Sequence, residues 1–172
     1  MDLVTGNQLK PTQNVIFGST VVINNSGDAS GEIKGNLANQ DFEKNNETVA
    51  VPNGYTYATG LQLIRGTTAG SKTLTLSGDN SNFVGPLTIG DGATAGVVYM
   101  GATSSGNPKN ALGGVTDITV NNSAELNLRG TAGDNIETNG DWDFFGNAKL
   151  TTNKRIVIGS GHTVTFGKSI NP

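Results

Sequence analysis

Short stretches in which apolar and polar residues alternate recur along most of the chain. Apolar residues stand two positions apart in each stretch, as they do in a strand with one buried face. Gly, Asn, Asp and Ser fill the segments between the stretches and supply the positive-φ positions that turns require. The pattern predicts an all-β fold of many short strands, and we expect the best helical candidate, residues 36–44, to be a loop. The alternating pairs are Val15/Phe17, Val21/Ile23, Val49/Val51, Leu61/Leu63, Leu74/Leu76, Leu87/Ile89, Val97/Tyr99, Ile118/Val120, Leu126/Leu128, Ile156/Ile158 and Val164/Phe166.

One arrangement of apolar residues occurs twice in the C-terminal half. Four apolar residues with spacings of two, six and two begin at Ile118 and begin again at Ile156, 38 residues later. A looser copy, with a longer turn, begins at Leu87 and ends at Tyr99. Pairs of short strands that are joined by a polar corner and recur at fixed offsets are typical of stacked coils.

This repeat favours a parallel β-helix, or β-solenoid, with short strands and Gly- and Asn-rich turns. Each strand of a solenoid pairs with its equivalent in the next coil, and the inward residues stack into one narrow core. About 20 residues per coil and about 4.8 Å between coils would give about 8 coils and a rod on the order of 40 Å tall. We expect residues 49–172 to form one continuous solenoid and residues 1–48 to form an irregular N-terminal coil or cap. A β-sandwich or jelly roll, which also alternates short strands with Gly-rich turns, is the competing interpretation.

The composition of the 172 residues fits a narrow core. Only 34% of the chain is hydrophobic and 6% is aromatic, while Gly, Asn, Thr and Ser together make up roughly 45%. No apolar run approaches the roughly 20 residues that a membrane-spanning helix needs. Eleven basic residues stand against 14 acidic ones, for a net charge of −3. Since no basic stripe stands out, we expect no nucleic-acid partner.

The chemistry that the chain can perform is limited by two residue counts. It has no Cys and a single His, His162, which excludes a Cys-ligated zinc site and any metal site with two histidines. A Ser-His-Asp arrangement would have to use His162 as its base. The sequence therefore predicts no catalytic site, metal centre or cofactor, and leaves carboxylates as the only candidates for calcium binding or glycosidase chemistry.

The most distinctive candidate site is Asp141-Trp142-Asp143. In an extended segment the two carboxylates share one face, about 7 Å apart, and Trp142 lies on the other. One interpretation is a calcium or sugar-binding site, with Trp142 or Phe144 stacked on a sugar ring. The alternative is that Trp142 and Phe145 fill the core or a bend while the aspartates are only solvated.

Two further features near this triplet have weaker patterns. Asp134 and Glu137 extend the acidic group, but the spacing matches neither an EF-hand loop nor the Gly-rich calcium repeat. His162 stands in a Gly-rich corner, at the position equivalent to Ala124 if the two copies of the repeat are aligned. We expect His162 to be a solvated turn residue.

Residues 76–130 resemble the autotransporter-associated β-strand repeat of bacterial passenger domains. The order of the elements matches as well as their composition: a Leu-x-Gly-x-Asn start with a Gly a few residues on, a strand with a Gly-rich corner, an Ala-Leu-Gly element, and a closing Val-x-x-x-Ala-x-Leu-x-Leu stretch. Residues 102–109 depart from the pattern as an insertion, which we expect to protrude. The matching residues are Leu76, Gly78, Asn80, Gly85, Leu87, Ile89, Gly90, Gly92, Ala111, Leu112, Gly113, Gly114, Val120, Ala124, Leu126 and Leu128.

The resemblance implies a right-handed parallel β-helix that is exported to the surface of a Gram-negative bacterium and acts as a stalk or adhesive surface. Its partner would be a protein or glycan of a host or neighbouring cell. Residues 1–3 lack the basic start of a signal peptide and no apolar run follows, so we expect none, whether the chain is an excised segment or a short free-standing relative. Two alternatives remain. One is a subunit that associates end to end into an extracellular filament or surface layer, and the other is a fragment of a carbohydrate-active β-helix enzyme or phage tail spike.

Overall fold

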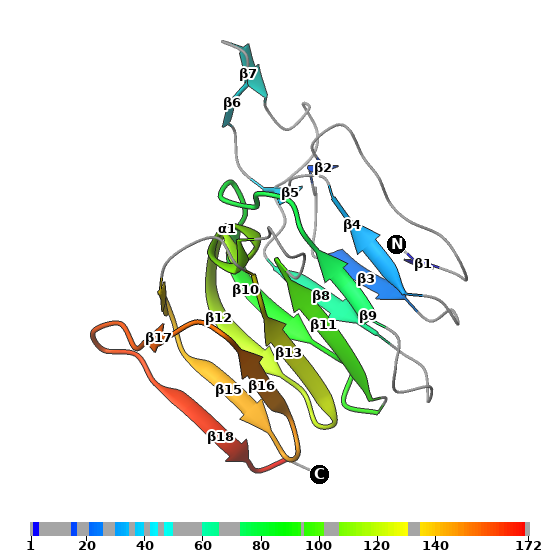
Figure 1. Ribbon diagram of the computed structural model, residues 1–172, viewed down its shortest axis with the longest axis vertical. Coiled ribbons are helices and arrows are strands. Elements are labelled where there is room, and N and C mark those ends of the chain that lie inside the picture. Colours follow the sequence, from blue (N-terminus) through cyan, green and yellow to red (C-terminus); the bar gives the residue numbers. More distant parts are fainter. Residues whose placement is uncertain are drawn as a thin grey trace.

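The structure is a computed structural model dominated by two parallel β-sheets. It describes residues 2–3, 15–16, 21–25, 30–34, 37–39, 42–44, 47–49, 60–65, 73–93, 95–101, 107–130 and 135–170. The larger sheet has seven strands in the order β1-β3-β8-β10-β12-β15-β18, and the smaller has five in the order β16-β13-β11-β9-β4. Figure 1 shows the strands of each sheet side by side, in an order that follows the sequence colours.

The bounds of the elements are as follows. The seven-stranded sheet contains β1 (Asp2–Leu3), β3 (Val21–Asn25), β8 (Leu61–Ile64), β10 (Val84–Ile89), β12 (Gly114–Val120), β15 (Trp142–Phe145) and β18 (Val164–Lys168). The five-stranded sheet contains β4 (Gly31–Ile33), β9 (Thr73–Leu76), β11 (Gly96–Met100), β13 (Ala124–Leu128) and β16 (Lys149–Thr152). Three small sheets pair β2 (Val15–Ile16) with β5 (Leu37–Ala38), β14 (Ile136–Glu137) with β17 (Ile156–Val157), and β6 (Phe42–Lys44) with β7 (Glu47–Val49).

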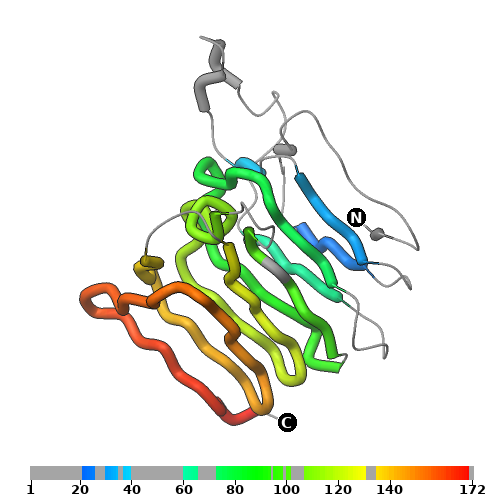
Figure 2. Tube along the Cα trace, in the orientation of Figure 1, coloured from blue at the N-terminus to red at the C-terminus, as the bar shows by residue number. Residues whose placement is uncertain are grey.

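The chain alternates between the two large sheets. From β8 to β13 each strand of one sheet is followed along the chain by a strand of the other, and β15, β16 and β18 continue the alternation. The pairing in both sheets is parallel throughout, and β6 with β7 is the antiparallel pair among the described strands. The tube in Figure 2 follows this path from the blue to the red end. The predicted all-β architecture of short parallel strands is confirmed at this level.

Register keeps the apolar residues of the seven-stranded sheet in two continuous ladders. Their inner members are almost fully buried between the two sheets, where each Leu or Ile contributes about 1.5–3 kcal/mol of hydrophobic stabilisation. One ladder contains Val21, Leu61, Leu87, Ile118, Trp142 and Val164, and the other contains Ile23, Leu63, Ile89, Val120, Phe144 and Phe166. The facing ladders of the five-stranded sheet contain Gly31, Leu74, Val98, Leu126 and Leu150, and Ile33, Leu76, Met100, Leu128 and Thr152.

The ladders correct the repeat that the spacing predicts. Val164 pairs with Trp142, which pairs with Ile118, so the C-terminal strand is equivalent to β12 and not to β13. Ile156 belongs to β17 instead. Successive equivalents in the second ladder, from Leu63 to Phe166, lie 26, 31, 24 and 22 residues apart. These returns are longer than the predicted 20 residues and uneven, so the 38-residue spacing is coincidental.

The orientation of β11 is also shifted by one residue from the prediction. The pair expected to face the core is Val97 and Tyr99, but Val98 and Met100 are the buried residues of this strand. Val97 instead joins the other row, beside Thr73 and Glu125. Four apolar residues in succession satisfy either alternation, so the register follows from the neighbouring strands, which place Leu74 and Leu126 inside.

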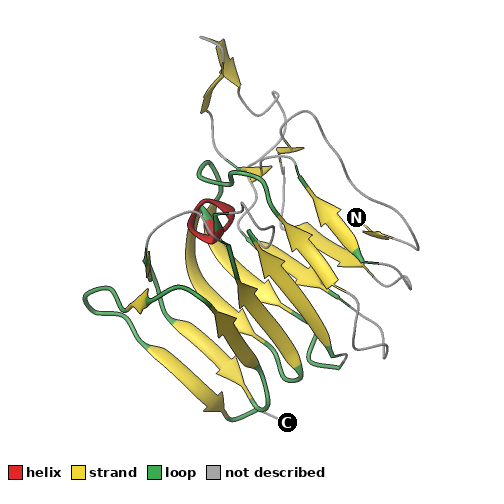
Figure 3. Cartoon of the chain, in the orientation of Figure 1, coloured by secondary structure: helices red, strands yellow, loops and turns green. Residues whose placement is uncertain are grey.

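A five-residue helix, α1 (Pro108–Leu112), lies at one end of the strands in Figure 3. Asn107 caps it by accepting hydrogen bonds from the amides of Lys109 and Asn110, and Gly113 ends it with a φ of 64°. The helix therefore belongs partly to the expected insertion at 102–109, whose residues 102–106 lie outside the described residues. Residues 37–38 and 42–44, expected to be loop, are strands.

The boundary predicted at residue 48 falls between strands that share the same sheets. β3 and β4 precede it, yet β3 pairs with β8 and β4 pairs with β9. The predicted pairs Val15/Phe17 and Val49/Val51 lie partly outside the described residues. No helix in the described part of the chain is long and apolar enough to cross a membrane.

Candidate functional site

The triplet Asp141-Trp142-Asp143 lies at the start of β15 and alternates as its sequence predicts. Trp142 points inward and is 2% exposed, while Asp141 is exposed and Asp143 is half-buried on the outer side. Phe144, the other aromatic residue considered for sugar stacking, is fully buried and stacks against Phe166 with ring centroids 4.6 Å apart. The two rings therefore lie in the interior, where a sugar in solution does not reach their faces.

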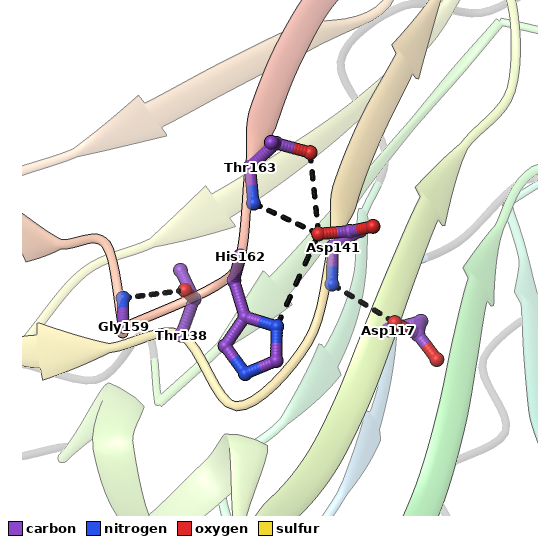
Figure 4. Close-up of polar contacts among 6 residues, drawn as sticks. All are labelled: Asp117, Thr138, Asp141, Gly159, His162 and Thr163. Atoms are coloured by element: carbon purple, nitrogen blue, oxygen red, sulfur yellow. Dashed lines mark hydrogen bonds and ion pairs between the residues drawn. The ribbon is translucent and has the colours of Figure 1, made fainter.

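Asp141 links its coil to the next through its side chain. One carboxylate oxygen, Oδ1, accepts hydrogen bonds from the Thr163 amide at 2.8 Å and the Thr163 hydroxyl at 3.2 Å. Asp117 does the same one coil earlier, because its Oδ1 accepts from the Asp141 amide at 2.9 Å. Figure 4 shows this succession from Asp117 through Asp141 to Thr163. These three residues each precede an inward residue of the same ladder, so the carboxylates fix the register between coils.

His162 belongs to the same corner. Its Nδ1 lies 4.0 Å from Oδ1 of Asp141, and its side chain is about one-third exposed. Because the Thr163 hydroxyl donates to Asp141 and not to His162, the three side chains lack the nucleophile-to-base contact of a catalytic triad (Figure 4). The predicted equivalence of His162 and Ala124 is wrong, since Ala124 pairs with Gly96 in the five-stranded sheet.

Asp143 is paired with a cation from the next coil. Its carboxylate forms an ion pair with the ammonium group of Lys168, and that ammonium also lies 5.3 Å from the centroid of the Phe145 ring. Of the other acidic residues in the predicted group, Glu137 is exposed on β14 and Asp134 lies outside the described residues. Within the described ranges, no three His, Asp or Glu side chains are close enough to hold a metal ion.

A pocket of about 190 Å³ opens beside the inner face of Trp142. Val115, Ile118 and Trp142 form its apolar floor, and Lys109, Glu137 and Asn139 contribute polar groups. The indole Nε1 of Trp142 has no hydrogen-bond partner, but it is buried and shielded from solvent. Since pockets for drug-sized ligands measure about 300–1,000 Å³, this space is small, and no described polar group points a ligand into it.

Asparagines at the coil corners are structural residues that the search for functional side chains missed. Asn80 is 2% exposed; its Oδ1 accepts from the Leu37 amide at 2.8 Å and its Nδ2 donates to the Ala111 carbonyl at 2.6 Å. Asn121 donates to the Gly90 carbonyl at 2.9 Å in the same manner. The signal for Asn80 is present in the sequence, as the Asn of the Leu-x-Gly-x-Asn element, but its partners lie 43 and 31 residues away.

Comparison of the chain with protein-family models, with curated proteins and with solved structures gave no significant match. The interpretation of function therefore depends on the geometry described above and on the sequence pattern of residues 76–130.

Proposed function

We propose that this chain is a right-handed β-solenoid segment that serves as a non-enzymatic structural and adhesive module on a bacterial surface, in the manner of an autotransporter passenger. The observation that carries the proposal is the pair of continuous apolar ladders in the seven-stranded sheet. A chain that returns to the same two sheets, in parallel and in constant register, is built as successive coils. Right-handed crossovers are the general rule for parallel strands of one sheet.

The corner residues support the resemblance on which the bacterial part of the proposal depends. Asn80 connects strands from three successive passes of the chain through its side chain. Gly113, from the Ala-Leu-Gly element, has a φ of 64°, and a Cβ there would lie 1.9 Å from the Asn80 carbonyl oxygen. Residues of two separate motif elements therefore fit against each other, as expected if the motif encodes one coil corner.

The outer side of the seven-stranded sheet supports the adhesive part. Its central row consists mostly of polar side chains, half-buried or exposed, which repeat at about 4.8 Å. Such a row offers many similar hydrogen-bonding groups on a stiff support, which favours multivalent contact with proteins or glycans of another cell. The row contains Val22, Gln62, Thr88, Thr119, Asp143 and Thr165.

An adhesion experiment tests this proposal. Beads that carry the purified chain are mixed with host and bacterial cells, and bound beads are counted. A variant in which Thr88 and Thr119 are both replaced by Lys disrupts the row, and its matched control replaces Thr75 and Thr151 by Lys on the outer side of the five-stranded sheet. We expect adhesion by the chain and by the control, with a loss of at least about threefold in the Thr88/Thr119 variant.

Location is tested separately in the source organism. An antibody against this segment is used on intact cells before and after external protease treatment. Loss of the signal on protease treatment supports surface exposure. A signal that survives until the cells are broken open would contradict the proposed location, and failure of every cell type to bind the beads would contradict adhesion.

A further inference from the structure

The coil formed by β16, β17 and β18 has an apolar face that the other coils do not expose. These three strands lie at the edges of their sheets. Phe166 stacks on Phe144 with one side, yet it is 58% exposed, and Ile158 and Ile170 are 53% and 55% exposed. Elsewhere in the ladder of Phe166, the described side chains from Ile23 to Phe144 are fully buried. We call the side of this coil that bears Ile158, Phe166 and Ile170 the open face.

The backbone of β18 also has unpaired hydrogen-bonding groups on this side. The Trp142 amide donates to the Thr163 carbonyl, so the residues of β18 that bond to β15 alternate from Thr163 onward. The amides and carbonyls of Val164 and Phe166 therefore point away from β15, toward the open face. An edge of this kind pairs readily with another strand.

The charge of this coil is opposite to that of the remaining chain. Residues 147–172 contain four of the eleven basic residues, Lys149, Lys154, Arg155 and Lys168, and no Asp or Glu. Residues 1–146 therefore hold the other seven basic residues and all fourteen acidic ones. Lys168 is paired with Asp143, which leaves the cations of β16 and the following turn as the charges near the open face.

We infer that the open face binds a second copy of this chain, head to tail, through the β4 edge of that copy. β4 is the edge strand at the opposite end of the five-stranded sheet. If the register of that sheet continues across the junction, Gly31, Glu32 and Ile33 of the second copy lie beside Leu150, Thr151 and Thr152. Glu32 is then diagonal to Lys149 on the outer side, within reach of its long side chain.

Charge and geometry favour this occupant over other arrangements of two copies. Two open faces together would place like charges in contact, whereas the head-to-tail arrangement brings the basic coil against the acidic part of the chain. Because a head-to-tail contact leaves one free face at each end, it extends into filaments instead of closing into a dimer. The inference depends on the stacked-coil part of the proposed function and is independent of adhesion.

Sedimentation of the full chain over a range of concentrations tests the inference. We expect association that increases with concentration and weakens with added salt. Phe166→Lys should weaken it at least about tenfold. The matched control is Val84→Lys, because Val84 is 44% exposed on β10, away from the open face, and it should associate like the original chain. A chain that stays monomeric at every concentration, or equal effects of the two substitutions, would overturn the inference.

Cross-linking tests the orientation independently of Phe166. The chain has no Cys, so single-cysteine variants report only the introduced contact. Glu32→Cys mixed with Thr151→Cys should give cross-linked dimers with a short bismaleimide, whereas Thr151→Cys alone should give few. Efficient cross-linking of Thr151→Cys with itself would show that two open faces meet and would overturn the head-to-tail arrangement.

Two further readouts separate this inference from other outcomes. Circular dichroism of each variant reports whether the β-structure is retained; a chain that lacks cooperative β-structure contradicts the proposed function, whereas a folded monomer contradicts only the inference. Vesicles of phosphatidylglycerol test the basic coil against anionic lipid. Binding of the monomer to these vesicles, without self-association, would assign the face to a membrane and overturn the inference.

Discussion

Replacement of Asn80 by Ala should destabilise the chain far more than the loss of one small side chain suggests. The side chain is buried and makes two hydrogen bonds, one to the Leu37 amide and one to the Ala111 carbonyl. Neither backbone group has water nearby to replace the lost partner, since both bonds are buried. An unpaired buried group costs about 1–3 kcal/mol, so the two together cost about 2–6 kcal/mol.

That loss is large compared with the stability of a typical domain, about 5–15 kcal/mol. For a chain of this size it lowers the melting temperature on the order of 10 °C. Urea unfolding, followed by circular dichroism, measures the change in the free energy of unfolding. The slope of that free energy against urea should stay constant, because the substitution leaves the folded architecture in place.

Asn127 provides a matched control for Asn80. It is equally buried, at 2% exposed, but its Nδ2 donates only to Glu125 of its own strand, and its Oδ1 has no partner. Asn127→Ala removes an already unpaired buried oxygen, so we expect a change below about 1 kcal/mol. Equal losses of stability in the two variants would refute the view that Asn80 stabilises the fold by joining coils.

Three more outcomes follow from the corners and the acidic triplet. Gly113→Ala should cost at least about 3 kcal/mol in thermal unfolding, because the new Cβ meets the Asn80 carbonyl at a φ of 64°; Gly92→Ala, with a φ of 83° and nothing within 4 Å, should cost only about 1–2 kcal/mol, and similar costs would contradict the role of the close contact. Asp143→Asn removes a surface ion pair and should change stability by about 1 kcal/mol or less, and millimolar calcium should raise the melting temperature no more in the original chain than in an Asp141→Asn/Asp143→Asn variant. Incubation with a broad panel of polysaccharides should release no sugar ends, and release that these two substitutions abolish would favour a carbohydrate-active enzyme.

Alternation along single strands was the part of the fold that could be predicted most directly. Leu87/Ile89 and Ile118/Val120 are predicted to face one side, and both pairs are buried and lie in register on adjacent strands. The same rule fails for β11, where Val97 and Val98 are both apolar and only the neighbouring strands decide the register. A period of two carries no information where every position is apolar.

The coil length could not be predicted, because returns of unequal length hide the true equivalences. The helix α1 lengthens the return that ends at Val120, and the one that ends at Phe166 is shorter. Signals for α1 are present in Asn107, Pro108 and Gly113, which are typical of a capped helix start and its C-terminal end. Its five residues are too few for a helical period of apolar residues to appear.

The candidate site could be predicted in its local geometry but not in its contacts. Alternation correctly separates Trp142 from the two carboxylates. The partners of those carboxylates, Thr163 and Lys168, lie 22 and 25 residues further along the chain. They come into contact only because β15 and β18 pair in a defined register, which the sequence of the triplet does not contain.

Distances between pairs of spin labels along the outer row of the seven-stranded sheet test the stacked coils most directly. One label stays at Thr165 and the second is placed in turn at Thr119, Thr88, Gln62 and Val22, all of which lie in one register row. The account predicts a distance that increases by about 4.8 Å for each strand, although 40 residues separate the last two positions and only 26 separate Thr88 from Gln62. Distances that follow sequence separation, or that fail to increase along the row, would contradict the stacked coils.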